Sequence, residues 1–145
     1  MEIRKANKKD YNEIMHIWES AVKTTHDFLS EEDFLYFKEK MPTDYLPAVE
    51  LYVLTEEDIK GFVGVSGDML EMLFIHAGSR GKGYGKALLQ YASDHLRITK
   101  VDVNEQNKQA VGFYEKMGFK QIGRSEKDAM GKDYPILHFI FAGNI

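Results

Sequence analysis

The chain of 145 residues contains no cysteine, few prolines and no long apolar run. Without cysteine it cannot form a disulfide, bind a metal through a thiolate or use a thiol as a nucleophile, and this composition suits a reducing cytoplasm. No segment approaches the roughly 18 apolar residues of a membrane span, and the N-terminus lacks the apolar core of a signal peptide. The formal net charge of -4 gives no general attraction to nucleic acid or anionic lipid. We therefore expect a cytoplasmic protein that binds neither nucleic acid nor membrane.

The composition is nevertheless sufficient for a sizeable core, because hydrophobic residues make up 43% of the chain and aromatic residues 12%. No repeat, low-complexity tract or flexible linker interrupts the sequence, so we expect one domain over residues 1–145. The five histidines show no spacing with carboxylates that is typical of metal ligands. We therefore expect no metal.

Hydrophobic periodicity predicts a mixed α/β fold with the element order β-α-α-β-β-β-α-β-α-β-β and a largely antiparallel sheet. Apolar residues recur at helical spacing in residues 7–22, 30–42, 83–92 and 107–117. Short β-type runs occupy residues 2–6 and 100–104, and two more lie between 119 and 141. Turn signals at 56–58 and 66–68 divide residues 50–76 into three strands.

The segment HAGSRGKGYGKALLQYA, residues 76–92, combines glycines with basic residues and then becomes apolar. We expect a strand to end at Ile75 and a helix to begin near Gly83, with a glycine loop between them. Such a loop exposes backbone N–H groups at the positive end of the helix dipole, and glycines let an anion approach the main chain. Arg80, Lys82 and Lys86 add full charges at the rim, which favours an anion site over a plain turn.

Two common phosphate-binding motifs do not match this loop. A P-loop requires Ser or Thr after Gly85-Lys86, where Ala87 stands, and Arg80 occupies the place of its first glycine. The dinucleotide fingerprint G-x-G-x-x-G also fails, because the third glycine comes one residue early at Gly85. A nucleotide-phosphate binder of either type is therefore disfavoured.

The loop resembles the R-x-x-G-x-G pyrophosphate loop of the GCN5-related N-acetyltransferases (GNAT). A second segment, NKQAVGFYEKMGF, is similar to the family pattern N-x-x-A-x-x-x-Y-x-K-x-G-F, and TTHDFLS at 24–30 resembles small stand-alone bacterial members. The resemblance covers nearly the whole chain. The matching residues of the two motifs are Arg80, Gly83, Gly85, Asn107, Ala110, Tyr114, Lys116, Gly118 and Phe119.

The resemblance implies acetyl coenzyme A as cosubstrate, with its pantetheine arm along one strand and its pyrophosphate in the loop. Asn107 would hydrogen-bond the pantetheine arm or only cap its helix. The residues implied for cofactor binding are Leu73, Phe74 and Ile75 in the strand, Arg80, Gly81, Lys82, Gly83, Tyr84, Gly85 and Lys86 in the loop, and Asn107.

The reaction implied by the resemblance is acetyl transfer from a thioester to a primary amine. Because no cysteine can carry the acetyl group, we expect the amine to attack directly. Tyr114 matches the family tyrosine that protonates or hydrogen-bonds the leaving thiolate, and a strand N–H near Leu73 is the candidate donor to the oxyanion. Glu71 is expected on the strand face of Leu73 and Ile75, either as the general base or at a splayed edge in contact with solvent.

The family commonly builds its acceptor pocket in the connection between the first two helices. His26 and Phe28 would contact the substrate there, or His26 would only anchor the loop. His76, Tyr134 and His138 are weaker candidates. Gly112, inside a predicted helix, suggests close approach of backbone or cofactor, because glycine costs a helix about 0.5–1 kcal/mol relative to alanine.

These residues predict an acetyl-CoA-dependent N-acetyltransferase whose acceptor is a primary amine of a small molecule, a peptide or a protein lysine. The alternative from another class is a non-catalytic module that senses acyl-CoA through the same loop. Tyr114 and Glu71 favour the enzyme, since binding coenzyme A requires neither. The sequence leaves the oligomeric state open, with a homodimer as one option.

Overall fold

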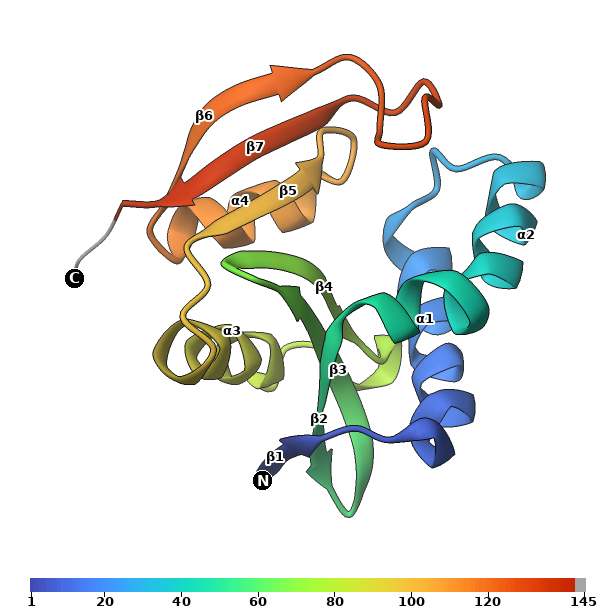
Figure 1. Cartoon of the computed structure of the whole chain (residues 1–145), viewed down its shortest axis with the longest axis vertical. Coiled ribbons are helices and arrows are strands. Elements are labelled where there is room, and N and C mark those ends of the chain that lie inside the picture. The colour runs from blue at the N-terminus through green and yellow to red at the C-terminus, as the bar shows by residue number, and fades with distance from the viewer. Residues whose placement is uncertain (143–145) are drawn as a thin grey trace. The chain divides into compact units, whose positions relative to one another are not determined.

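The computed structural model describes residues 1–142 and divides into two compact units, Met1–Ile98 and a second unit that begins at Thr99. Each unit is mixed α/β, and the strand pairings within each are antiparallel. The helices and strands follow one another in the order that hydrophobic periodicity predicts (Figure 1). The predicted α/β class and the largely antiparallel pairing are therefore confirmed.

The sheet of the first unit contains four strands in the order β1 (Glu2–Lys5), β2 (Glu50–Glu56), β3 (Asp58–Ser66) and β4 (Met69–Ile75). The two connections after β2 are the tight turns that the sequence predicts. Glu57 has φ 76° in the first turn and Gly67 has φ 60° in the second. A left-handed residue in each turn lets the chain reverse within one or two residues, which fixes the register of β2, β3 and β4.

Two helices follow β1. α1 (Tyr11–Thr25) is preceded by a short 3-10 turn, where Asn7 and Asp10 form a reciprocal capping box. α2 (Glu31–Lys40) begins at Ser30, whose Oγ accepts a 3.1 Å hydrogen bond from the N–H of Asp33. α2 ends before Pro42, and the coil continues as a wider π-type turn (Met41–Tyr45) and a 3-10 turn (Leu46–Ala48).

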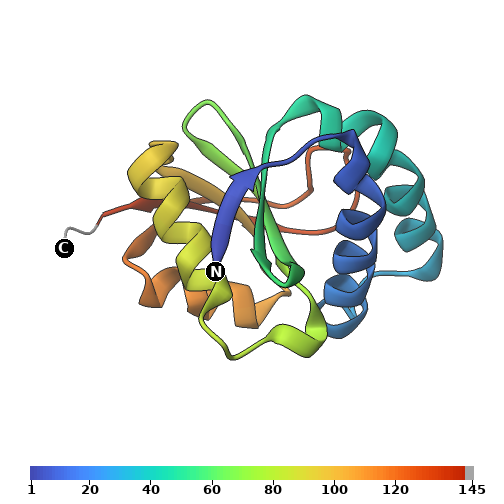
Figure 2. The same cartoon turned by 90° about the horizontal axis from the view of Figure 1, so that it is seen from below.

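The helices of the first unit cover opposite faces of its sheet (Figure 2). On one face Ile14, Ile17 and Trp18 of α1 pack with the fully buried Phe62 of β3. On the other face lies α3 (Tyr84–His95), whose buried residues include Leu88 and Leu89. Gly61 lies against this second helix, since a Cβ there would lie 3.3 Å from Leu88 Cδ1 and only 2.5 Å from Ile75 Cδ1. The absence of a side chain at Gly61 therefore leaves room for the side chains of Ile75 on β4 and Leu88 on α3.

The second unit has a three-stranded sheet in the order β5 (Lys100–Asn104), β7 (Ile136–Phe141) and β6 (Phe119–Ser125). α4 (Lys108–Lys116) precedes β6, and its buried Tyr114 contacts the ring of Phe119 edge to face with centroids 5.7 Å apart. Gly118 has φ 98° and follows the last turn of the helix, where a left-handed residue ends it. β6 and β7 are separate strands with a long connection between them, as Figure 1 shows.

Candidate functional site: the loop between β4 and α3

The segment after β4 is a single short turn held by three hydrogen bonds. Residues Ala77–Ser79 form a 3-10 turn, in which the N–H of Ser79 donates to the carbonyl of His76 at 2.8 Å. Nδ1 of His76 accepts a 3.0 Å bond from the N–H of Gly78. The N–H of Ala77 donates to Oγ of Ser20 on α1 at 3.0 Å. His76 is therefore a cap of this turn.

The next residues form a cup of backbone N–H groups. Gly81 has φ 79° and Gly83 has φ 84°, conformations that residues with a Cβ adopt only at a cost. Within residues 1–142, none of the N–H groups from Gly81 to Lys86 donates to a protein acceptor, and the first bond of the helix runs from Ala87 to the carbonyl of Gly83 at 3.0 Å. Unsatisfied N–H groups at a helix start bind anions.

The side chains around this cup leave it open and positively charged. A Cβ at Gly81 or Gly83 would meet no atom within 4 Å, so the space in front of the main chain is empty. Among the described residues, Arg80, Lys82 and Lys86 form no salt bridge, and Lys82 and Lys86 are exposed. These cations can therefore face a ligand with several negative charges, such as a pyrophosphate.

Tyr84 differs from the other loop residues because its side chain points into the protein. The ring is buried, with 5% exposed, and its hydroxyl donates a 3.1 Å hydrogen bond to Oε1 of Glu56 at the end of β2. Burial raises the pKa of the phenol, and the bond to Glu56 raises it further. Only the backbone N–H of Tyr84 is available to the cup.

β4 contains an irregularity at Glu71. In the β3–β4 register Gly64 faces Met72 and Val65 faces Leu70, so Glu71 has no opposite residue and forms a β-bulge. Its side chain is exposed. Leu73, Phe74 and Ile75 follow in regular pairing with β3, as predicted, and are half-buried.

The connection between α1 and α2 lies over β4 through aromatic contacts. The ring of His26 packs against Phe28 at 5.1 Å and Phe74 at 6.4 Å between centroids. The Thr25 hydroxyl donates its only hydrogen to the carbonyl of Ala21 at 2.8 Å, so in its 2.8 Å contact with His26 it accepts from Nδ1–H. Burial lowers the pKa of His26 to about 4. The imidazole is therefore neutral at pH 7 and anchors the loop, with Nε2 unprotonated.

Two predicted residues lie in the second unit. Tyr114 has 6% of its surface exposed, and burial raises the pKa of its phenol well above the usual value. No hydrogen bond joins its hydroxyl to another of residues 1–142. Oδ1 of Asn107 accepts a 3.2 Å bond from the N–H of Ala110, so Asn107 caps α4. Gly112 is exposed, and a Cβ there would meet no atom within 4 Å, so the expected close approach of the protein backbone is wrong.

The loop, the β4 residues and the α1–α2 connection therefore belong to one unit, and Tyr114 and Asn107 to the other. Sequence reasoning missed Ser20 and Glu56, which hold the two ends of the loop by hydrogen bonds. Both partnerships join residues far apart in the chain, and no local pattern marks them.

Over residues 1–142 no group of three or more His, Asp or Glu side chains is placed to hold a metal ion.

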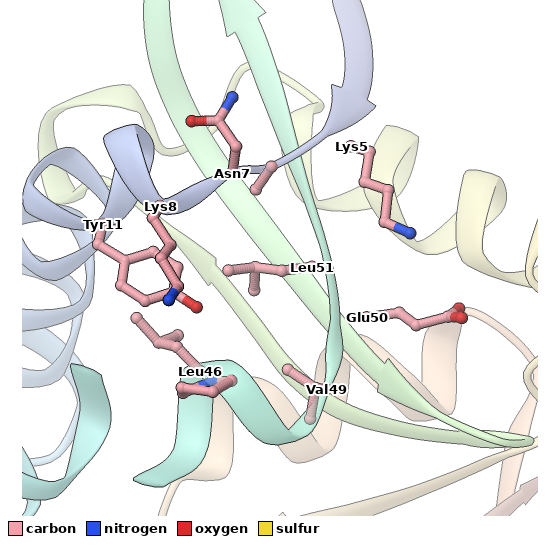
Figure 3. A pocket seen from close by; sticks show the side chains of 10 residues that line it. Lys5, Asn7, Lys8, Tyr11, Leu46, Val49, Glu50 and Leu51 are labelled. Carbon is pink, nitrogen blue, oxygen red and sulfur yellow. The ribbon is translucent and has the colours of Figure 1, made fainter. Parts of the chain in front are cut away.

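A pocket of about 250 Å³ opens elsewhere in the first unit, between the end of β1, the start of α1 and the start of β2 (Figure 3). Lys5 and Glu50 lie at one side of it, and Lys8 and Tyr11 at the other. None of the residues predicted for cofactor, substrate or catalysis lines this pocket.

Over the described part of the chain no helix combines the length and apolar character that a membrane crossing requires.

A strand, a glycine cup of free N–H groups and a helix, in this order within a mixed α/β fold, are the features of a coenzyme A-dependent acyltransferase. The sequence model of the acetyltransferase (GNAT) domain matches residues 13–133, and the chain belongs to this family. It is an N-acetyltransferase with acetyl-CoA as the acetyl donor. The predicted family, activity and cosubstrate are thereby confirmed, and the alternative of a non-catalytic sensor is not supported.

The similar proteins include bacterial enzymes of the same size. The chain is 42% identical over 141 residues to the peptidyl-lysine N-acetyltransferase YjaB of Salmonella typhimurium, which covers 96% of this chain and 97% of that protein. The solution structure of apo-form YjaB from Escherichia coli has a TM-score of 0.91 at 39% identity, covering 99% of this chain and 98% of the other. The PaiA N-acetyltransferase of Thermoplasma acidophilum, in complex with coenzyme A, shares the fold with a TM-score of 0.75 at 21% identity, covering 94% and 96%.

Proposed function

We propose that the acceptor of this N-acetyltransferase is the side-chain amine of a lysine in a peptide or protein. The support is the name of the YjaB relatives, which are peptidyl-lysine N-acetyltransferases, together with their coverage of nearly the whole chain. A mildly acidic chain is also suited to basic peptide segments, since its formal net charge is -4. A small-molecule amine is the competing acceptor class.

The cup of N–H groups from Gly81 to Lys86 supports the donor half of the reaction, because it fits a pyrophosphate. We infer that these residues and Arg80 hold the pyrophosphate of acetyl-CoA, and that the main chain of Leu73, Phe74 and Ile75 binds its pantetheine arm. Acetyl-CoA supplies the thioester that the amine attacks. Asn107 already caps α4 through Oδ1, so its side-chain NH2 is the group left for the pantetheine.

Tyr114 is proposed as the residue that hydrogen-bonds or protonates the departing thiolate. Its buried phenol stays protonated across the physiological range, which suits a donor and excludes a general base. Its hydroxyl has no hydrogen-bonding partner among residues 1–142, so it can donate to a ligand. The N–H of Leu73 is proposed as the donor to the oxyanion.

Glu71 is proposed as the group that takes the amine proton, directly or through water. A lysine amine has a pKa of about 10.4 and is mostly protonated at neutral pH, so an acceptor for its proton is required. An exposed carboxylate at a β-bulge is reachable by water and by an incoming side chain. His26 and Phe28 are proposed to shape the acceptor entrance, where the neutral His26 anchors the loop on Phe74.

We further infer that the two units act together as one acetyltransferase domain over residues 1–145, because the family match at 13–133 spans both. The bacterial relatives and the absence of cysteine support a cytoplasmic bacterial enzyme. We propose no nucleic-acid or membrane partner. A measurement of the molar mass of the protein in solution would show whether two chains associate.

The direct test measures release of coenzyme A thiol from acetyl-CoA in the presence of two matched sets of amines. One set holds lysine-containing peptides with basic, neutral and acidic flanks, and the other holds small polyamines and aminosugars. We expect thiol release to depend on a peptide lysine and the product peptide to gain one acetyl group at that lysine by mass spectrometry. Turnover with the small amines alone would overturn the assignment of the acceptor.

A further inference from the structure

Three polar side chains of the second unit form a continuous chain of hydrogen bonds that acetyl transfer to an amine does not require. Nδ1 of His138 lies 2.7 Å from Oδ1 of Asp102, and Nε2 of the same ring lies 2.7 Å from Oγ of Ser125. Asp102 comes from β5, His138 from the central strand β7 and Ser125 from β6. The sequence alone places His138 among the weak candidates and gives no role to the other two.

The three side chains meet because of the strand register. Asp102 and His138 are directly opposite each other in the β5–β7 pair, and their neighbours Val101, Val103, Leu137 and Phe139 are buried. Since side chains alternate between the faces of a strand, Asp102 and His138 lie on the opposite, open face. His138 is 34% exposed and Asp102 is 44% exposed, so a reagent can reach them.

β6 brings Ser125 to the other side of the ring. His138 faces Gly123 in the β6–β7 pair, where a bulge shifts the register between Gln121 and Gly123. A Cβ at Gly123 would lie 3.5 Å from His138 Cδ2, so the glycine keeps the space beside the ring clear. Ser125, two residues further along β6, then reaches Nε2.

The hydrogen bonds fix the tautomer of His138. An ionised carboxylate only accepts, so Nδ1 carries the hydrogen toward Asp102, and Nε2 of the neutral ring presents its lone pair to the Ser125 hydroxyl. A carboxylate, an imidazole and a hydroxyl in this order are the arrangement that activates a serine as a nucleophile. The Ser125 hydroxyl can therefore lose its proton to His138 as its oxygen attacks an electrophilic carbon.

We propose that Ser125, His138 and Asp102 form a second acyl-transfer site, in which Ser125 reacts with small acyl esters that carry a good leaving group. The Ser125 oxygen forms a bond to the acyl carbon while Nε2 of His138 takes its proton. The bond between the acyl carbon and the leaving oxygen breaks, and the imidazolium returns the proton to that oxygen. Water then attacks the acyl-serine in the same way, releasing the carboxylic acid and restoring Ser125.

The first test uses the full chain with p-nitrophenyl acetate as the probe. We expect p-nitrophenol release to fall roughly tenfold in S125A and in D102N, with an acetyl group on Ser125 in peptide mass spectra of the unchanged chain. S66A is the matched control, because Ser66 is an exposed serine at the end of β3. Equal release by S125A and S66A, with no acetyl group on Ser125, would overturn the proposal.

The second test uses the absence of cysteine from the chain. In S125C the only thiol lies beside His138, so its rate of alkylation by iodoacetamide at neutral pH reports activation by the imidazole. We expect this rate to be roughly fivefold higher than in S125C/H138Q and in S66C. Far-UV circular dichroism serves as the control that each variant is folded. Equal rates in the three variants would show that the hydrogen bonds only link the strands.

Discussion

The hydroxyl of Tyr84, the first residue of α3, donates a 3.1 Å hydrogen bond to Oε1 of Glu56, the last residue of β2. This bond joins the start of the helix to the sheet at a residue within the cup of N–H groups. The direction of the helix start, and so the direction of its N–H groups, is therefore set by a contact outside the loop.

In Y84F the ring still fills its buried site, and the link to Glu56 is lost. We expect acetyl-CoA to bind about threefold more weakly and thermal unfolding to occur at a lower temperature, because the cup is less well oriented. Titration calorimetry measures the first quantity. E56Q is the comparison, since its amide oxygen still accepts from Tyr84 while the negative charge is removed. Unchanged binding in Y84F together with weaker binding in E56Q would assign the effect to the charge and not to the bond.

Gly83 gives a prediction with a close control in the same chain. In G83A the left-handed φ of 84° costs about 1 kcal/mol of stability, and the methyl group enters the cup where a phosphate would lie. G67A carries a similar strain at φ 60° in a turn where a Cβ meets no atom. We expect both variants to unfold more easily and only G83A to bind acetyl-CoA roughly tenfold more weakly. If G67A lost binding equally, the effect would be one of general stability.

Tyr114 is expected to act on turnover and not on binding. In Y114F the ring contacts with Phe113 and Phe119 remain, and only the hydroxyl is removed. We expect kcat to fall about a hundredfold while the Kd of acetyl-CoA changes less than about twofold, since in the proposed role the hydroxyl acts only as the thiolate leaves. Steady-state kinetics and calorimetry separate the two. Loss of binding with unchanged kcat would remove Tyr114 from the reaction.

Glu71 is expected to govern the dependence of the rate on pH. In E71Q the exposed carboxylate is lost without a change of size, and turnover at neutral pH should fall roughly tenfold. Activity should recover toward alkaline pH, where more of the acceptor amine is already neutral. E13Q on the exposed surface of α1 is the control. An E71Q profile parallel to that of the unchanged enzyme would assign the proton to another group.

The half-buried His26 makes the stability of the fold depend on pH in the acid range. Burial lowers its pKa in the folded state to about 4, whereas the unfolded chain binds a proton near pH 6.5. Between these values the unfolded state holds more protons, so stability falls as the pH falls from 6.5 to 4. From pH 7 to pH 5 the contribution of His26 is about 2 kcal/mol at most. Urea unfolding of the unchanged chain and of H26N at both pH values isolates this term, which should be absent in H26N.

Local signals account for much of what could be predicted from the sequence. The turns at Glu57 and Gly67 depend on neighbours in the chain and lie where the sequence predicts them. The cap at Ser30 and the helix end at Gly118 are equally local. The loop at 76–92 belongs to the same group, because its glycines and the following helix define the cup. These features are set by backbone geometry within a few residues.

The features that could not be predicted depend on residues far apart in the chain. The bulge at Glu71 follows from the pairing of β4 with β3, and a strict alternation of side chains does not reveal it. The bond from Ala77 to Ser20 and the chain through Asp102, His138 and Ser125 also join separate elements. At Gly112 a residue that is costly in a helix suggests close approach of backbone or cofactor, and the protein itself leaves this position open.

The bond between the N–H of Ala77 and Oγ of Ser20 has a mechanical consequence. Ser20 lies near the end of α1, a few residues before the connection that carries His26 and Phe28. A peptide that displaced this connection would also displace α1, and α1 holds Ala77 through Ser20. Binding of the peptide acceptor would therefore change the position of the turn that precedes the proposed acetyl-CoA site. An ordered binding of the two reactants is consistent with this connection.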